Sequence, residues 1–261
     1  MTGTGKSTTC NLITNSRVFH EDTGFESATA EIAHKDVMSA GMPIRVIDTV
    51  GFMSTGESEQ TRDAKFAQFA DLASYGVDIF LFTEKYGRFT EVNEQNFLLF
   101  KELVGPEALR HTLFLFTHVT NQRLQQEIQK GQVPQSLQAI MCQVGGIVGI
   151  DSKANPRLAV ADLRSAMAEL VKRNSELRYS NESLSAAAER REALQKKIDA
   201  IPIKHVRDIL TQKRRGLSNG TEIHEDVERA VQEAQASGGK CEDTTCCGGV
   251  ATKILTRRRM I

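Results

Sequence analysis

A short segment near the N-terminus has the residue types of a phosphate-binding loop. Residues 2–8 read T-G-T-G-K-S-T, and the G-K-S within them matches the second half of the pattern G-x-x-x-x-G-K-[ST]. In such a loop, backbone N–H groups point at phosphate oxygens, the lysine reaches the β- and γ-phosphates, and the hydroxyl ligates Mg²⁺. The predicted nucleotide-binding residues are Gly3, Thr4, Gly5, Lys6, Ser7 and Thr8, with Lys6 also catalytic and Ser7 also a metal ligand. The alternative is a flexible terminus rich in glycine and threonine.

A second group of candidate residues lies about 40 positions downstream. The apolar segment I-R-V-I-D-T-V-G reads as a strand that ends in D-x-x-G. Asp48 is placed to hold Mg²⁺ through water, and the N–H of Gly51 can reach a γ-phosphate; the alternative is an aspartate that caps a turn. Between the two motifs, Thr29 is the candidate for closing over Mg²⁺ and the γ-phosphate. Thr23 and Ser27 are its rivals, and any of the three can equally be a plain surface residue.

The elements that must position these residues alternate along the chain. Short apolar, β-branched runs predict strands at 43–50, 77–86, 111–119 and 145–151, with an edge strand at 28–39. Helical spacing and terminal glycine or proline signals predict helices at 61–76, 90–105, 135–145 and 156–174. This alternation predicts an α/β fold, a mostly parallel sheet with helices on both faces, and the loop and D-x-x-G motifs indicate the P-loop NTPase type.

The expected domain organisation has three parts. Residues 1–180 form the α/β domain, and residues 181–215 form a charged helical extension that Pro202 breaks or kinks. Residues 216–261 contain a linker, a short amphipathic helix and a glycine-rich tail that we expect to be disordered. The extension is expected to pack on the G domain or to form a partner-binding coiled segment.

Several quoted segments together resemble one family. They are "TGTGKSTTCNLI", "RVIDTVGF", "GRFTEVNEQNF", "GPEALRHTLFLFTHV" and "LRYSNES". The chain resembles the GIMAP-type GTPases (the avirulence-induced-gene family), which are related to septins and to chloroplast-import Toc GTPases. The resemblance covers about residues 2–185, and the segment "GRFTEVNE" is its most specific part. It implies that residues 1–180 are a G domain, with guanine nucleotide (GTP or GDP) and Mg²⁺ as ligands.

The resemblance also implies a base-reading motif after the strand at 111–119. The matching segment is F-T-H-V-T-N, in which Thr117 and His118 are the candidate base contacts. Thr120 occupies the position of the aspartate that grips guanine in ordinary GTPases, and Asn121 can replace it only with a shift of one residue. A charge-assisted bond of that kind is worth about 1.5–3 kcal/mol, so part of the guanine preference is in doubt. The alternative for His118 is a half-buried histidine at a strand end.

A second base-contacting loop is expected after the strand at 145–151. By position, Asp151 and Ser152 match the paired polar residues of the family at this loop. The prediction agrees with the general location of ligands at the carboxyl ends of parallel strands. The alternative is an Asp-Ser turn that precedes a helix.

The sequence lacks the residue that small GTPases use to orient the attacking water. Small GTPases place a glutamine after the glycine of D-x-x-G, but Phe52 occupies that position here. We therefore expect slow intrinsic turnover. The resemblance implies a homodimer or oligomer across the nucleotide face, with Arg88 supplied in trans as a catalytic arginine. The alternative is a surface arginine paired with Glu91 or Glu94.

Composition limits the other possibilities. The formal net charge is zero, which gives no overall field for binding nucleic acid. The five cysteines form no regular framework, which suits the cytoplasm. Cys246 and Cys247 are expected to be free thiols in the tail, with S-acylation as the alternative, so membrane contact through them and the terminal R-R-R is possible but unsupported.

The sequence thus predicts a nucleotide-dependent switch or dimerising scaffold that hydrolyses GTP slowly. One alternative is a nucleotide-binding or nucleotide-free scaffold without turnover, and another is an ATP or mixed-nucleotide hydrolase. The first glycine of the loop pattern would fall one position before Met1, and no residues precede the loop to form its strand. We therefore expect residues 1–261 to be a fragment or an incomplete reading frame that lacks the first strand, with a genuine short form as the rival.

Overall fold

The computed structural model describes residues 4–19, 32–39, 42–49 and 59–200, together with residues 208, 210, 211, 227, 229 and 232. The chain divides into two compact units. The first comprises Met1–Phe66 and Gly76–Ser180, and the second comprises Ala67–Tyr75 and Asn181–Ile261. The first unit ends where we expect the G domain to end, although the segment 67–75 belongs to the second. The expected three-part domain organisation stays a prediction.

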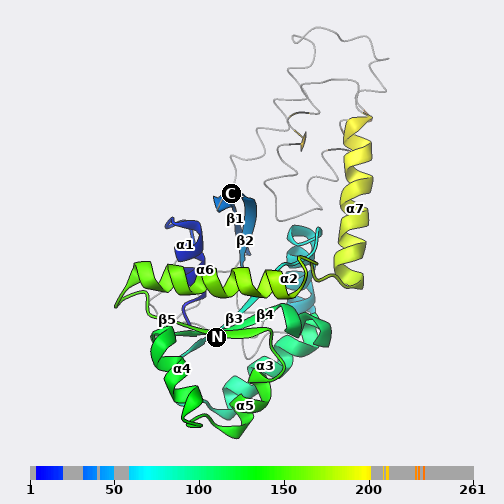
Figure 1. Cartoon of the computed structure of the whole chain (residues 1–261). Helices are drawn as coiled ribbons and strands as arrows, with labels where there is room; N and C mark the ends of the chain where they lie inside the picture. The colour runs from blue at the N-terminus through cyan, green and yellow to red at the C-terminus, as the bar shows by residue number, and fades with distance from the viewer. Residues whose placement is uncertain are drawn as a thin grey trace. The chain divides into compact units, whose positions relative to one another are not determined.

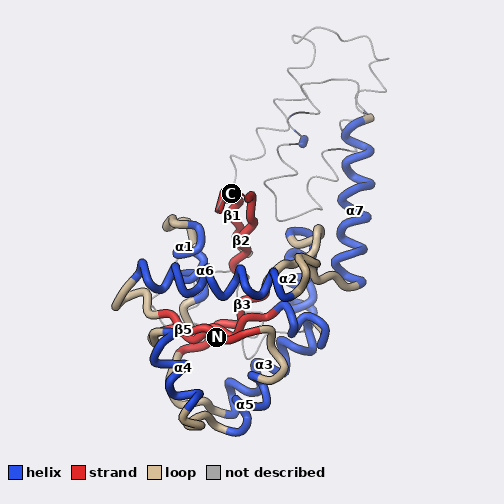
Figure 2. Tube along the Cα trace, in the orientation of Figure 1, coloured by secondary structure: helices blue, strands red, loops and turns tan. Residues whose placement is uncertain are grey.

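The first unit contains a parallel sheet with the order β3-β4-β5; strands are coloured red in Figure 2. Its strands are β3 (Phe80–Lys85), β4 (Thr112–Thr117) and β5 (Gly146–Ile150). Every residue of the central strand β4 is buried, as its continuous apolar sequence predicts. These strands confirm the α/β fold class, with ends a few residues inside the predicted limits.

The strand that carries Asp48 belongs to a separate sheet. It is β2 (Met42–Asp48), which pairs antiparallel with β1 (Ala33–Ser39) so that Ala33 lies opposite Asp48. Among the described residues, β2 forms no ladder with the parallel sheet, so our expectation of one mostly parallel sheet holds for β3, β4 and β5 only. Side-chain packing still joins the two sheets, because Ile44 and Val46 pack against a core cluster that includes Leu115 of β4.

Helices cover both faces of the parallel sheet (Figure 1). On one face, Phe114 and Phe116 of β4 pack in a cluster with residues of α3 (Glu91–Val104), α4 (Asn121–Gln129) and α5 (Gln135–Met141). On the other face, Leu115 packs with residues of α1 (Lys6–Thr14) and α6 (Pro156–Arg173). The alternation of residues 114, 115 and 116 between the faces is the period of a strand buried on both sides.

Local signals explain where most of these helices begin and end. Asn155 is the N-cap of α6 and accepts a hydrogen bond from the N–H of Leu158 at 3.1 Å, with Pro156 in the first turn. Gly105 ends α3 with φ 87°, a conformation that favours glycine. The helix α4 was not predicted, and the 3₁₀ segment Pro106–His111 leads into β4.

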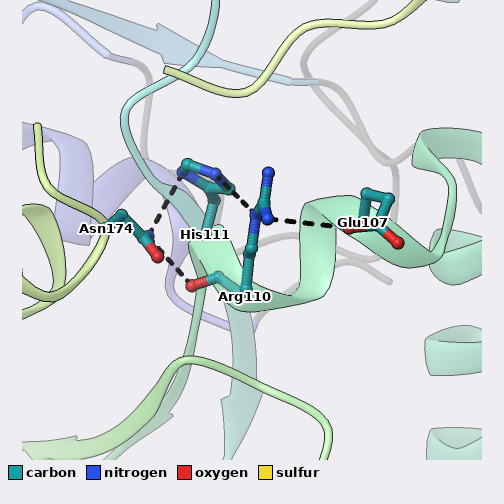
Figure 3. Close-up of polar contacts among 4 residues, drawn as sticks. All are labelled: Glu107, Arg110, His111 and Asn174. Carbon is teal, nitrogen blue, oxygen red and sulfur yellow. Dashed lines mark hydrogen bonds and ion pairs between the residues drawn. The ribbon is translucent and has the colours of Figure 1, made fainter. Parts of the chain in front are cut away.

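A buried histidine, His111, ends the 3₁₀ segment directly before β4, where it lies beside Arg110 and Asn174 (Figure 3). His111 is 1% exposed; its Nε2 accepts a hydrogen bond from Nε of Arg110 at 3.3 Å, and its Nδ1 lies 3.3 Å from the carbonyl oxygen of Asp78. Asn174 donates to the carbonyl of Arg110 at 3.1 Å. The same Nδ1 of His111 lies 3.3 Å from Nδ2 of Asn174. The accepting Nε2 describes a neutral ring, and burial lowers the pKa of His111.

This environment predicts a loss of stability at acidic pH. The pKa of His111 is lower in the folded than in the unfolded protein. The free energy of unfolding is therefore unaffected by this group above about pH 6.5, and it falls below that pH because the unfolded chain takes up a proton first. One proton gives a slope of at most about 1.4 kcal/mol per pH unit. Urea unfolding of the wild type and of His111→Gln between pH 8 and pH 5 measures the difference. Equal slopes in the two proteins would show that His111 is not responsible.

The described part of the second unit is mainly helical. Its helix α7 (Glu182–Asp199) starts at the N-cap Asn181, and Arg190 pairs with Asp71 of α2 (Glu59–Leu72) at 3.2 Å. The helix falls within the predicted extension, which stays a prediction, and Pro202, Cys246 and Cys247 lie outside the described residues. Within the described part of the chain, no helix combines the length and apolar character needed to cross a membrane.

Candidate functional site

Thr4 and Gly5 of the phosphate loop contact Thr117 at the end of β4. Gly5 precedes α1 with φ 91°, and a Cβ at this position would lie 2.9 Å from Cγ2 of Thr117. The hydroxyl of Thr117 donates to the carbonyl oxygen of Thr4 at 3.0 Å. Both the backbone conformation and the lack of space therefore require glycine at position 5. The helix α1 begins at Lys6, directly after this glycine.

The predicted metal ligands Ser7 and Asp48 lie side by side although they are 41 positions apart. Oγ of Ser7 donates to Oδ2 of Asp48 at 2.7 Å, and Asp48 is 4% exposed at the end of β2. Burial raises the pKa of Asp48, while the Ser7 hydroxyl and the Lys6 charge act in the opposite direction. A hydroxyl and a carboxylate at one point are the hard oxygen donors that Mg²⁺ prefers. Their role as ligands stays a prediction.

Lys6 carries a partly buried charge beside these donors. Burial lowers the pKa of Lys6, and the carboxylates of Asp48 and Glu84 oppose this shift. Thr4 supplies a further polar group, because its Oγ1 is buried and has no hydrogen-bond partner among the described residues. A buried hydroxyl without a partner is costly, and a phosphate oxygen would satisfy it. The described part of the loop therefore fits a phosphate group.

The loop after β4 has a different arrangement from a guanine-reading aspartate motif. His118 is exposed and has φ 63°, so the half-buried histidine of the alternative reading is not found. The hydroxyl of Thr120 caps α4 by accepting from the N–H of Arg123 at 3.4 Å. Oδ1 of Asn121 accepts from the N–H of Gly149 at 3.3 Å. The two residues considered for base reading thus have structural bonds of their own.

The loop after β5 lies beside the loop after β4, because the N–H of Val119 donates to the carbonyl of Ile150 at 3.3 Å. Asp151 follows at once, and its Oδ1 accepts from the N–H groups of Lys153 at 3.2 Å and Ala154 at 3.0 Å. This is the turn of the alternative reading. A base contact by Asp151 or Ser152 stays a prediction.

Arg88 lies exposed in the loop between β3 and α3. The structure describes Arg88, Glu91 and Glu94, and no ion pair joins the arginine to either carboxylate. The surface pairing considered as its alternative role is therefore not found. Some predicted positions lie outside the described residues, and their roles stay predictions: Gly3, Thr23, Ser27, Thr29, Gly51 and Phe52.

Sequence reasoning missed one charged residue of the site. Glu84 lies near the end of β3, is 3% exposed, and accepts a hydrogen bond from Nδ2 of Asn93 at 3.0 Å. Burial raises its pKa, and the bond from Asn93, the N-terminal amine and the charge of Lys6 oppose this. The available signal was a glutamate within the apolar run V-D-I-F-L-F-T-E-K-Y.

Comparisons with known proteins agree on one family and one fold. Residues 1–198 match the family model of the AIG1 family. The mouse protein GTPase IMAP family member 8 is 27% identical over 115 residues, which are 44% of this chain and 17% of that relative. A dimerization-deficient mutant of Toc33 from Arabidopsis thaliana has a similar structure, with a TM-score of 0.50, 16% identity, and coverage of 66% of this chain and 81% of Toc33. Toc33 in complex with GDP and Mg²⁺ matches with a TM-score of 0.48, 17% identity and the same coverage.

Proposed function

Because the chain belongs to the AIG1 family and has the fold of a G domain, we propose that it binds GTP and GDP with Mg²⁺ and hydrolyses GTP slowly. In this proposal the nucleotide state controls dimerisation or assembly, and hydrolysis resets it. The observation that carries the proposal is the 2.7 Å bond between Ser7 and Asp48 directly beside Gly5 and Lys6.

Each described residue of the loop has a definite task in this account. Gly5 turns the backbone so that the first N–H groups of α1 face the phosphates. Lys6 places its ammonium group against the β- and γ-phosphates, and the hydroxyl of Thr4 is left free to bond a phosphate oxygen. Ser7 and Asp48, with Thr29, would hold Mg²⁺, which when bound would neutralise part of the phosphate charge.

The proposal also includes slow turnover and dimerisation. Phe52 in place of the water-orienting glutamine supports slow intrinsic hydrolysis. Exposed Arg88, with no ion pair to Glu91 or Glu94, is available to a second copy of the chain. Toc33, a protein of similar fold, has a dimerization-deficient mutant, which supports testing dimerisation here.

Base preference can be tested at Thr120. Replacing Thr120 with aspartate is expected to raise the preference for GDP over ADP by about 10- to 150-fold, because a carboxylate forms charge-assisted bonds worth about 1.5–3 kcal/mol with guanine. Aspartate is also a good N-cap, so α4 keeps its start. Titration with the two nucleotides measures the ratio.

Thr120→Asn is the matched control, since it also caps a helix but carries no charge. A smaller gain in Thr120→Asn than in Thr120→Asp is expected. An unchanged ratio of affinities in Thr120→Asp would show that position 120 does not face the base.

The proposal as a whole is tested by the nucleotide content of the purified protein and by hydrolysis at several protein concentrations. Bound guanine nucleotide and a specific rate that rises with concentration are expected. Protein that is empty and has no turnover would instead support a scaffold function. Bound adenine nucleotide would support an ATP or mixed-nucleotide enzyme, which the absence of an aspartate at position 120 also favours.

A further inference from the structure

Three buried or partly buried charged side chains meet at the phosphate loop, one more than the loop and D-x-x-G motifs require. Lys6 and Asp48 belong to the motifs, whereas Glu84 comes from the neighbouring strand β3. Asp48 is 4% exposed and Glu84 is 3% exposed, so both carboxylates are removed from water. A nucleotide would add several more negative charges to this point.

The backbone places Glu84 next to the loop. The hydroxyl of Thr117 lies between the two segments, 3.0 Å from the carbonyl oxygen of Thr4 and 3.4 Å from the carbonyl oxygen of Glu84. Lys6 follows Thr4 by two positions, and its charge lowers the pKa of both Asp48 and Glu84, with the N-terminal amine acting on Glu84 in the same direction. Two carboxylates thus lie near the charge of Lys6 before any ligand is considered.

The Glu84 carboxylate is also held in position from α3. Nδ2 of Asn93 donates to Oε2 of Glu84 at 3.0 Å. Oδ1 of the same amide accepts from the N–H of Thr90 at 2.9 Å and from its hydroxyl at 2.6 Å. These bonds fix the amide orientation, so its NH₂ group faces the carboxylate. Glu84 therefore stays directed by α3 and does not turn toward solvent.

We propose that Glu84 is an affinity-determining residue that competes with nucleotide phosphate for Lys6. In the nucleotide-free protein it supplies part of the negative charge that Lys6 requires, and in the bound protein it repels the phosphates. The inference rests on the proposed nucleotide-binding function and adds to it an internal competitor that weakens binding.

The test uses fluorescently labelled GDP without Mg²⁺ and the full chain. Glu84→Gln keeps the shape and the bond to Asn93 but removes the charge, and it is expected to bind GDP about tenfold more tightly than the wild type. Glu102→Gln, an exposed position on α3, removes the same charge away from the site and is expected to leave affinity unchanged. Equal or weaker binding by Glu84→Gln would overturn the competition.

A second measurement needs no nucleotide. The change in melting temperature caused by Glu84→Gln is compared in the wild-type and Lys6→Met backgrounds. In the Lys6→Met background, Glu84→Gln is expected to shift the melting temperature upward by about 3 °C relative to its effect in the wild type, because Glu84 there no longer has the positive charge of Lys6. The same change in both backgrounds would exclude the interaction. If the wild type binds no GDP, both the proposed function and the competition fail. If the wild type binds GDP and Glu84→Gln binds it with the same affinity, only the competition is refuted.

Discussion

Replacing Arg88 with alanine is expected to lower the concentration-dependent rate of GTP hydrolysis by a factor of about 10³ or more, while affinity for GDP stays unchanged. An arginine supplied in trans stabilises charge that develops only in the transition state. Arg88 is exposed and forms no ion pair with Glu91 or Glu94, so it requires no rearrangement before it can enter a second copy's site. The loop that carries it is anchored by the bonds of Thr90 to Asn93.

Two variants define this effect. Arg88→Lys keeps the charge but lacks the planar fork of guanidinium, so it is expected to recover only part of the rate. Arg164→Ala removes an exposed arginine from α6 and is expected to behave as the wild type. The role of Arg88 would be refuted if Arg88→Ala kept a rate that still rises with protein concentration.

Replacing Lys6 with methionine is expected to weaken GTP binding by about 30-fold to several thousand-fold. Truncating one partner of a buried charge pair costs about 2–5 kcal/mol, and Lys6 would face the β- and γ-phosphates from a partly buried position. Burial lowers the pKa of Lys6 and shows that its charge is poorly solvated. Equilibrium titration with labelled GTP measures the loss.

Lys172→Met is the control, because Lys172 is exposed in the last turn of α6. Its affinity is expected to equal that of the wild type. If Lys6→Met also bound GTP with wild-type affinity, the loop would not contact the phosphates.

The sequence predicted the fold class and the meeting of Ser7 with Asp48, because both rest on patterns of short range. An apolar strand that ends in D-x-x-G and a loop that starts a helix can each be read locally, and the need of one Mg²⁺ for both side chains then predicts that they meet. The pairing of β2 could not be read in this way. It depends on which edges form ladders over long distances, and here β2 pairs with β1 in a sheet of its own.

Other features could not be predicted because they depend on packing between elements or on local hydrogen bonds. Residues 121–129 are mostly polar, with Leu124 their one buried side chain, so apolar periodicity was too sparse to predict α4. Thr120 and Asp151 hydrogen-bond to nearby backbone N–H groups; the sequence offered such a local role as the alternative for Asp151 and did not indicate it for Thr120. Glu84 was missed because its burial arises from packing among β3, β4 and α3, not from its own sequence neighbours.

The central claim is that Gly5, Lys6, Ser7 and Asp48 form a site for a guanine nucleotide with Mg²⁺. The most direct measurement is equilibrium titration of the wild-type chain with GDP, in the presence of Mg²⁺ and after its removal with a chelator. The account predicts saturable binding of one GDP per chain that is weaker without Mg²⁺. Failure to bind GDP under either condition would contradict it.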